Sequence, residues 1–311
     1  MGVVLLKRKL TSFQIIILGF SGVILFGTFL LMLPFSSRSG LATPFSDALF
    51  TSTSAVCVTG LIIHDTATYW SAFGQLVILL LIQIGGMGVI TVAASFAMIS
   101  GRKISLMQRS TMQEAISAPK VGGIVRLTGF IVRVTLVMEL LCAAVMAPVF
   151  CRDFGKIGLW MALFHSVSAF CNAGFDLMGA RQAYSSLTAY STDPLVCLVI
   201  AGLIITGGIG FLTLEDVRCH GPRFRHYHLQ SKFVLLASAF LLVAGFCYFY
   251  CLEFSSDRWQ MSESEAVLAS FFQAVSPRTA GFNSVDLTAL SPMSQLVTIL
   301  LMLVGAAPGS T

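Results

Sequence analysis

The sequence predicts an all-α integral membrane protein built from a repeated unit, and three observations support this fold class. Of 311 residues, 56% are hydrophobic and 11% are charged, whereas a soluble domain carries roughly 25% charged residues. The mean hydropathy is +0.86, and the apolar residues gather in long stretches. One short phrase also occurs three times at similar spacing. Because this small number of charged residues cannot cover the surface of a soluble protein of this length, we predict a chain that crosses a membrane several times.

Six apolar stretches predict six membrane spans, because about 20 apolar residues cross the hydrocarbon core. The first stretch follows Lys7-Arg8-Lys9 and continues to Leu33 without a small-residue cleavage site. We therefore predict a retained span and not a signal peptide. In chain order, the predicted spans are 13–33, 71–99, 123–149, 194–214, 231–252 and 292–311.

A shorter segment lies between the two spans of each pair: 44–60, 157–174 and 263–281. Each is too brief to cross the membrane, so we predict a short helix that enters the membrane and a loop that returns. Thr43 offers a capping hydroxyl before a proline at the first helical position, and Ser262 with Glu265 forms a capping box. Irregular backbone at membrane depth needs protein or a water-filled cavity beside it. The three loops are therefore expected to face one another around one axis.

The repeated phrase begins with a Phe and ends with a Gly ten residues later. It runs from Phe50 to Gly60, from Phe164 to Gly174 and from Phe271 to Gly281, and the glycines are 114 and 107 residues apart. A repeat at such a spacing indicates a duplicated structural unit. We assign 1–122 to repeat A, 123–230 to repeat B and 231–311 to repeat C, each with a span, a short pore helix, a loop and a second span.

The residues around the three glycines suit an ion path lined by backbone carbonyls. Such carbonyls replace the hydration shell of an alkali cation, and Gly permits the backbone angles that this requires. Each short helix would also aim its partially negative C-terminal end at the path. The alternative is three tight-turn glycines in ordinary hairpins, which three matching copies disfavour. The candidate ion-path residues are Cys57, Val58, Thr59, Gly60, Cys171, Asn172, Ala173, Gly174, Arg278, Thr279, Ala280 and Gly281.

Charged residues near the loops have two possible roles. Asp65, Asp176 and Asp286 follow the three glycines, and carboxylates at an outer mouth would concentrate cations there; the alternative is helix capping or a solvated loop charge. Arg278 is expected to point away from the axis and to hold loop carbonyls or an acidic partner, because charges at membrane depth are paired. Arg133 and Glu139 lie in the third predicted span, where we expect a structural role.

The distribution of Lys and Arg predicts the orientation of the chain. Twelve of the 19 lie at the N-terminus or in the connections 100–122 and 215–230 and their borders, against five on the other side, which places the N-terminus in the cytosol. The net charge of +5 reflects this asymmetry and does not suggest nucleic acid. His220, His226 and His228 lie in the second connection, where they could bind a metal, sense pH, or simply belong to a basic loop. The twelve are Lys7, Arg8, Lys9, Arg102, Lys103, Arg109, Lys120, Arg126, Arg218, Arg223, Arg225 and Lys232.

Together, these motifs resemble the superfamily of Trk, Ktr and HKT cation transporters. The resemblance rests on Cys-Val-Thr-Gly-Leu, Cys-Asn-Ala-Gly-Phe-Asp and Ser-Pro-Arg-Thr-Ala-Gly-Phe-Asn, and on the runs Ile84-Gly-Gly-Met-Gly88 and Thr206-Gly-Gly-Ile-Gly210. Because the chain begins at the first span of the first repeat, it is more similar to KtrB-type pore subunits than to TrkH-type subunits, which carry two extra N-terminal spans. The resemblance implies potassium uptake through a selectivity filter with four glycines, of which Gly60, Gly174 and Gly281 are three. It links Gly60 to potassium; a sodium-permeable or non-selective transporter is the alternative.

The end of the sequence resembles the opening of the family's Gly-rich intramembrane gate. That segment comprises Gly305, Ala306, Ala307, Pro308, Gly309, Ser310 and Thr311. The family pattern then continues into a fourth repeat, so we expect a C-terminal truncation or a partial gene model. The alternative is an intact protein with three repeats.

The resemblance also implies the partners of the protein. It implies a homodimer in the lipid bilayer, which docks on a cytosolic ring of nucleotide-binding regulatory subunits through the basic regions 102–126 and 218–232. It implies no covalent cofactor, with K⁺, or Na⁺ in the alternative, as the transported ion. Ser, His and Asp are present, but no spacing joins them into a catalytic motif, so an intramembrane hydrolase is the less favoured reading.

Overall fold

The computed structural model describes residues 11–100, 106–116, 123–256, 258–307 and 309–310, and these residues are helical with connecting loops. In this described part, the only β-type pairing is an isolated bridge between Ser37 and Trp70. Among the residues that the structure describes, three helices are long and apolar enough to cross a membrane, or up to five if each bent helix pair counts as one span. The predicted all-α membrane fold is therefore confirmed.

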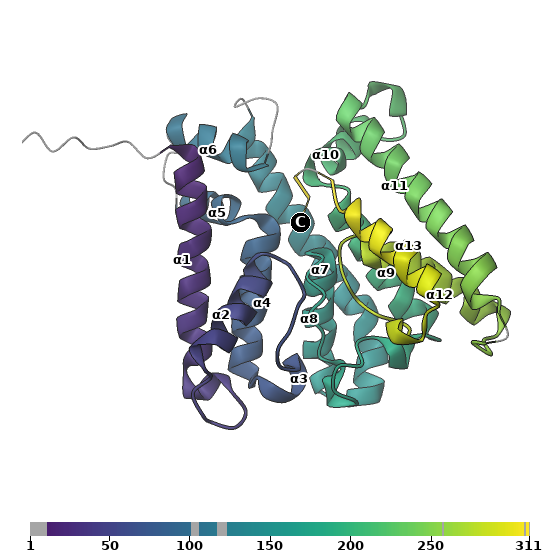
Figure 1. The fold of residues 1–311 in the computed structure, drawn as a ribbon. Helices are drawn as coiled ribbons and strands as arrows, with labels where there is room; N and C mark the ends of the chain where they lie inside the picture. Colours follow the sequence, from purple (N-terminus) through teal and green to yellow (C-terminus); the bar gives the residue numbers. More distant parts are fainter. Residues whose placement is uncertain (1–10, 101–105, 117–122, 257, 308, 311) are drawn as a thin grey trace, which may run out of the picture.

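The same order of elements recurs three times along the chain, and Figure 1 shows the three groups side by side, from purple through teal to yellow. The first group contains α1 (Ser12–Met32), α2 (Phe45–Val56), α3 (Thr66–Tyr69), α4 (Ala72–Met87), α5 (Val89–Ile99) and α6 (Leu106–Ile116). The second contains α7 (Ile124–Phe154), α8 (Ile157–Phe170), α9 (Pro194–Gly208) and α10 (Phe211–His220). The third contains α11 (Leu229–Tyr248), a π-helical turn (Phe249–Phe254), α12 (Glu263–Val275) and α13 (Pro292–Leu303).

Two of the predicted spans are broken helices. The pair α4 and α5 bends by 94°, and the pair α9 and α10 bends by 95°. Each break contains a glycine with a positive φ, 81° at Gly88 and 86° at Gly210, which side chains other than Gly rarely adopt. The predicted spans 71–99 and 194–214 are therefore each made of two helices that meet at a bend, where Gly88 follows the last residue of α4 and Gly210 precedes the first residue of α10.

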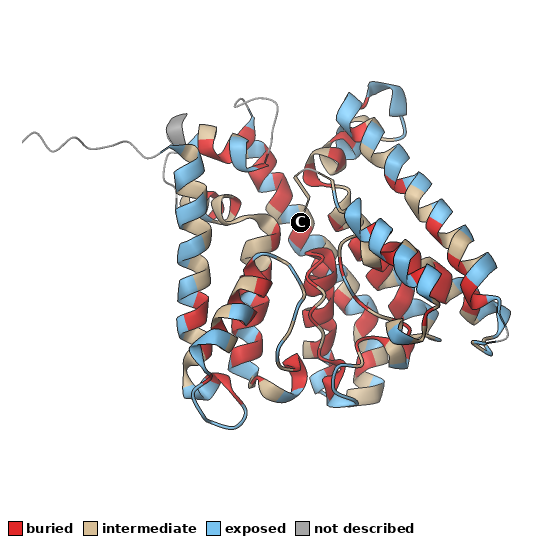
Figure 2. Cartoon of the chain, in the orientation of Figure 1, coloured by how far each residue is buried: buried red, intermediate tan, exposed pale blue. Residues whose placement is uncertain are grey.

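The distribution of buried residues matches a protein that lies in hydrocarbon. Figure 2 shows that α8 is largely buried, whereas α1 and α11 on the two flanks carry many exposed residues. Many of those exposed residues are large and apolar, including Phe13 at 69%, Phe233 at 71% and Phe240 at 71% exposure. A soluble surface rarely presents such a continuous apolar face. The chain is therefore a multi-pass membrane protein.

The two predicted helix starts have different outcomes. The capping box of α12 is confirmed, because the Ser262 hydroxyl accepts from the backbone of Glu265 while the Glu265 carboxylate accepts from the backbone of Ser262. The predicted cap at Thr43 is wrong. Pro44 is extended, so α2 starts only at Phe45, and the Thr43 hydroxyl accepts from the Tyr69 hydroxyl at 3.2 Å instead.

Candidate functional site: three loops around one path

Three short loops follow the helices that enter the membrane and do not cross it. We call them loop A (57–60), loop B (171–174) and loop C (278–281). The preceding helices α2, α8 and α12 end at Val56, Phe170 and Val275. The final glycine of every loop has a positive φ, 80° at Gly60, 70° at Gly174 and 76° at Gly281. The sequence position predicted to need Gly therefore does need it in all three loops.

The loops lie next to one another in chain order. A Cβ atom added to Gly60 would lie 2.7 Å from the carbonyl oxygen of Ala173, and one added to Gly174 would clash with the carbonyl oxygen of Ala280. Each glycine thus faces the carbonyl that precedes the glycine of the next loop. An added Cβ at Gly281 would meet nothing within 4 Å among the described residues. Loops A, B and C therefore lie next to one another in that order.

Loops A and B have the same backbone conformation. Val58 and Asn172 occupy the same position with φ of 54° and 56°. Each of these left-handed residues lies two positions before the glycine of its loop. The backbone N–H of the following residue donates to a carbonyl of the preceding helix, Thr59 to Ser54 and Ala173 to Ser168, both at 2.8 Å. The matching geometry explains why the first two copies of the phrase are the most similar.

Loop C has a different backbone conformation, although Gly281 ends the third copy of the same repeated phrase. Ser276–Arg278 form a 3₁₀ turn with Pro277 near its start, because proline presets the backbone for such a turn. The backbone N–H groups of Ala280 and Gly281 then both donate to the Ser276 carbonyl, at 3.0 and 3.1 Å. Loop C therefore reaches the same final glycine by another route.

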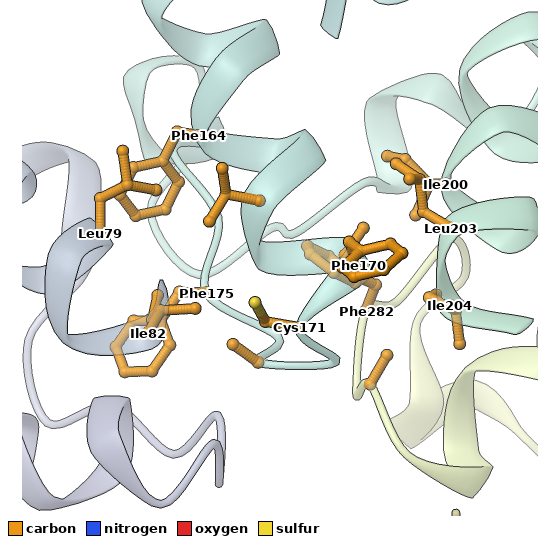
Figure 3. Close-up of a cluster of buried hydrophobic side chains, with 14 of the residues drawn as sticks. Leu79, Ile82, Phe164, Phe170, Cys171, Phe175, Ile200, Leu203, Ile204 and Phe282 are labelled. Carbon is orange, nitrogen blue, oxygen red and sulfur yellow. The ribbon is translucent and has the colours of Figure 1, made fainter. Parts of the chain in front are cut away.

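A direct hydrogen bond joins loops B and C. The Thr279 hydroxyl donates to Oδ1 of Asn172 at 2.7 Å, and Asn172 is only 2% exposed. Behind loop B, Figure 3 shows Phe170 and Cys171 between Ile82 of α4 on one side and Ile200, Leu203 and Ile204 of α9 on the other. Loop B is thus held in a packed apolar core, as a rigid carbonyl lining requires.

The first Gly-rich run lets a second-span helix approach the loops closely. A Cβ on Gly85 would clash with the carbonyl of Val56 at the end of α2. On Gly86, a Cβ would lie 2.5 Å from Sγ of Cys171 in loop B. The run therefore serves two purposes: close contact at its first two glycines and the helix break at Gly88.

The predicted gate segment crosses the break in the second bent helix pair. The backbone N–H of Ala307 donates to the Gly208 carbonyl, and the N–H of Phe211 donates to the Gly309 carbonyl, both at 3.0 Å. These bonds join Ala307 and Gly309 to the two sides of the break at Gly210. Two predicted gate residues, Pro308 and Thr311, lie outside the described part of the chain.

Arg278 connects loop C to the gate segment and to α11. Its Nη2 donates to the Ser238 hydroxyl at 3.2 Å and to the Gly305 carbonyl at 3.5 Å. No carboxylate within the described residues forms an ion pair with it. Arg278 therefore holds a loop carbonyl, one of the two partners that the sequence suggested.

The three aspartates differ in what their carboxylates bind. Asp65 is buried; it caps α3 by accepting from Thr68 and also accepts from the backbone of Tyr184 at 3.2 Å. Asp176 is half-buried and accepts from the Met178 backbone at 2.9 Å. Asp286 is exposed, and the hydroxyl and backbone N–H of Thr288 lower its pKa. Of the three, Asp286 best keeps a free surface charge.

The histidines of the second connection support the fold of that connection. His228 contacts the Asp216 carboxylate through Nδ1 at 2.6 Å, and the Ser231 hydroxyl donates to the same carboxylate. The Asp216 carboxylate thus ties His228 and Ser231 at the start of α11 to α10. In the part of the chain that the structure describes, no group of three or more His, Cys, Asp or Glu residues could hold a metal.

Bent pairs of apolar helices beside irregular loops that contact one another are typical of transporter-type integral membrane proteins. The family model of TrkH, described as "Cation transport protein", matches residues 7–311. The chain belongs to this family, whose members are transporters and not enzymes, so the hydrolase alternative is not supported.

Individual relatives agree with the family. The chain is 40% identical over 307 residues to the potassium/sodium uptake protein NtpJ of Enterococcus hirae. This alignment covers 98% of this chain and 67% of NtpJ. The chain is also 40% identical over 306 residues to the Ktr system potassium uptake protein B of Bacillus subtilis, covering 97% and 67%. The fold matches the crystal structure of the potassium transporter TrkH from Vibrio parahaemolyticus with a TM-score of 0.69 at 18% identity, covering 98% of this chain and 59% of that one. The chain thus spans about two thirds of the length of these curated relatives.

Proposed function

We propose that this protein takes up potassium, and that loops A, B and C line the selectivity filter. One observation carries the proposal: Gly60 and Gly174 each face the carbonyl before the next loop's glycine. Three loops in this arrangement turn backbone oxygens toward a shared path, which suits a dehydrated alkali cation. The names of the relatives, a potassium/sodium uptake protein and a potassium uptake protein B, support the same substrate class.

Rubidium uptake tests this proposal. The full-length protein, expressed in bacterial cells that lack their own potassium uptake systems, should accumulate radioactive rubidium, and external potassium should compete better than sodium. Equal competition by sodium would favour the second candidate, a sodium-permeable transporter, which the name of NtpJ supports. Absence of uptake in cells whose membranes contain the protein would contradict the proposal.

We also propose a wider organisation of the protein, which its membership of the family supports. We assign residues 1–122, 123–230 and 231–311 to repeats A, B and C. The N-terminus lies in the cytosol, as the basic residues indicate. The pore subunit forms a homodimer, and its basic cytosolic connections dock on a ring of nucleotide-binding regulatory subunits.

Asp286 provides a test of the outer mouth. Replacing Asp286 with Asn should raise the half-saturating rubidium concentration about twofold to fivefold and leave the maximal rate unchanged, because a mouth charge concentrates cations without touching the filter. The pKa of Asp286 lies below its ordinary value of 3.8, so the carboxylate stays ionised at every pH above 3.8. The difference in half-saturating concentration between wild type and variant should therefore persist from pH 5 to pH 8, and it should shrink only as the pH falls through the lowered pKa. The effect should also decrease at high ionic strength.

Asp65 provides the matched contrast for Asp286. Because its carboxylate is buried and bound to Thr68 and Tyr184, Asp65→Asn should lower the amount of folded protein more than it changes the half-saturating concentration. Unaltered uptake kinetics in Asp286→Asn at low salt would exclude a mouth role for that residue.

The gate segment can be tested at one backbone hydrogen bond. Ala307→Pro removes the N–H that donates to the Gly208 carbonyl, and such a bond contributes about 0.5–1.5 kcal/mol. The variant should therefore increase rubidium leak through the resting protein by about twofold to tenfold. Ala306→Pro is the control, since its N–H makes no backbone bond within the described residues. Equal leak in both variants would mean that this bond does not hold a gate.

A further inference from the structure

A carboxyl group lies buried in the membrane region behind loop B. Glu139 is in the middle of α7 and is 2% exposed. No Lys, Arg or His in the described structure forms an ion pair with it, and Arg133, its charged neighbour on the helix, is exposed. An ionisable group at membrane depth is costly and is kept for a function. Neither α1 nor α11, the corresponding first helices of the other groups, contains a carboxyl group.

Two donors from different parts of the chain converge on this carboxyl group. Nε2 of Gln83, on α4, donates to Oε2 at 3.2 Å. Sγ of Cys171, the first residue of loop B, donates to Oε1 at 3.9 Å. The main-chain carbonyl of Glu139 also accepts from the Ser166 hydroxyl of α8 at 2.7 Å. Glu139 therefore joins the second helix of the first group, the short helix α8 and loop B at a single residue.

The surroundings leave the Cys171 thiol no alternative position. A Cβ on Gly86 would lie 2.5 Å from the sulfur, and Cys171 has no exposed surface. Cys57, at the same position in loop A, is exposed. The thiol of loop B is thus enclosed between α4 and the Glu139 carboxyl group, whereas its counterpart in loop A is not.

Loop B is the loop whose position affects both of its neighbours. It offers the Ala173 carbonyl to Gly60 on one side, and Gly174 faces the Ala280 carbonyl on the other. Asn172 also accepts from Thr279. A small shift of loop B would therefore change two of the three sides of the path at once.

We propose that Glu139 is a positioning residue that clamps loop B to α4 through Cys171 and Gln83, and so sets the width of the ion path. The inference rests on the proposed function for its effect on ions, but not for the clamp itself. Gln83 and Cys171 both donate to this side chain, so it must accept two hydrogen bonds. A carboxyl group can do so with its two oxygens. An amide at the same place keeps one acceptor oxygen and loses the other.

The clamp is tested by the accessibility of Cys171. Purified full-length protein is treated with a membrane-permeant maleimide, and modification is mapped by mass spectrometry, with Cys57 in the same sample as the reference. Cys171 should resist modification in the wild type. Glu139→Ala should increase its modification roughly tenfold, since it removes both side-chain hydrogen bonds that link loop B and α4 to the carboxyl group. Glu139→Gln should give an intermediate increase.

The double variant Gln83→Glu with Glu139→Gln separates a specific clamp from a general structural role. It exchanges the amide and the carboxyl group, so protection of Cys171 should return to near the wild-type level. Arg133→Ala, on the same helix but exposed, is the control and should leave Cys171 protected. If Glu139→Ala fails to fold, Gln83→Ala removes one donor and should still expose the thiol. Full protection of Cys171 in folded Glu139→Ala or Gln83→Ala protein would overturn the clamp.

Ion selectivity tests the consequence for the path. The preference for rubidium over sodium should fall in Glu139→Ala in parallel with the gain in Cys171 modification, and the exchanged double variant should restore both. Increased modification with an unchanged preference would overturn the role in setting the path. If the wild type transports neither ion while the thiol still responds, the proposed function fails and the clamp stands.

Discussion

Replacing Gly174 with Ala is expected to reduce rubidium uptake to less than about a tenth of the wild-type rate. Gly174 has a φ of 70°, a conformation that costs other residues about 1–2 kcal/mol. An added Cβ would in addition clash with the Ala280 carbonyl, which is backbone and cannot rotate away as a side chain could. The substitution would therefore push loops B and C apart. The measurement is initial uptake per unit of protein in the membrane.

Gly202→Ala is the matched control for Gly174→Ala. Gly202 lies in α9, and an added Cβ there would meet nothing within 4 Å. Alanine is the better helix former, so this variant should keep wild-type uptake and abundance. Gly60→Ala should be impaired as well, since its Cβ would lie 2.7 Å from the Ala173 carbonyl. Wild-type uptake in Gly174→Ala at normal abundance would exclude loop B from the ion path.

The second large effect is expected on stability. Gly85→Ala places a Cβ against the Val56 carbonyl at the C-terminal end of α2, so α4 would have to move away from that short helix. Inserting a group into a filled contact usually costs about 1–3 kcal/mol. We therefore expect a lower melting temperature of the detergent-solubilised protein, followed by size-exclusion chromatography after heating, and less protein in the membrane.

The control for Gly85→Ala is Gly129→Ala in α7, where an added Cβ would meet nothing within 4 Å. Both variants make the same chemical change in a membrane helix, so their difference isolates the contact between α2 and α4. Equal melting temperatures for the two variants would show that α4 can move away from α2 at little cost.

The sequence predicted the positions of the three loop glycines because each answers a local backbone requirement. A glycine that must adopt a positive φ recurs at a fixed distance from a helix, so Gly60, Gly174 and Gly281 were found by their spacing alone. The Gly-rich runs resemble family signatures, but the sequence does not predict their physical role. Only the coordinates show that Gly88 and Gly210 break their helices, because hydropathy is the same along a straight or a bent span.

Contacts between distant segments could not be predicted in the same way. Glu139 and Gln83 are 56 residues apart in the chain, and Asn172 and Thr279 are 107 apart. Each member is an ordinary polar residue in its local sequence, and nothing in the spacing points to its partner. Likewise, Asp65 and Asp286 follow their glycines at the same distance, yet one is buried and the other exposed, because Tyr184 of the second group covers only the first.

For this protein, the sequence by itself determined the membrane class, the repeated unit and the glycines of the three loops. These features depend on composition, periodicity and backbone conformation, which act within a few residues of one another. The tertiary structure alone decided which loops are neighbours, the bends in the two helix pairs, and the buried carboxyl group behind loop B. Those depend on which surfaces meet after folding, and close packing settles that over the whole chain at once.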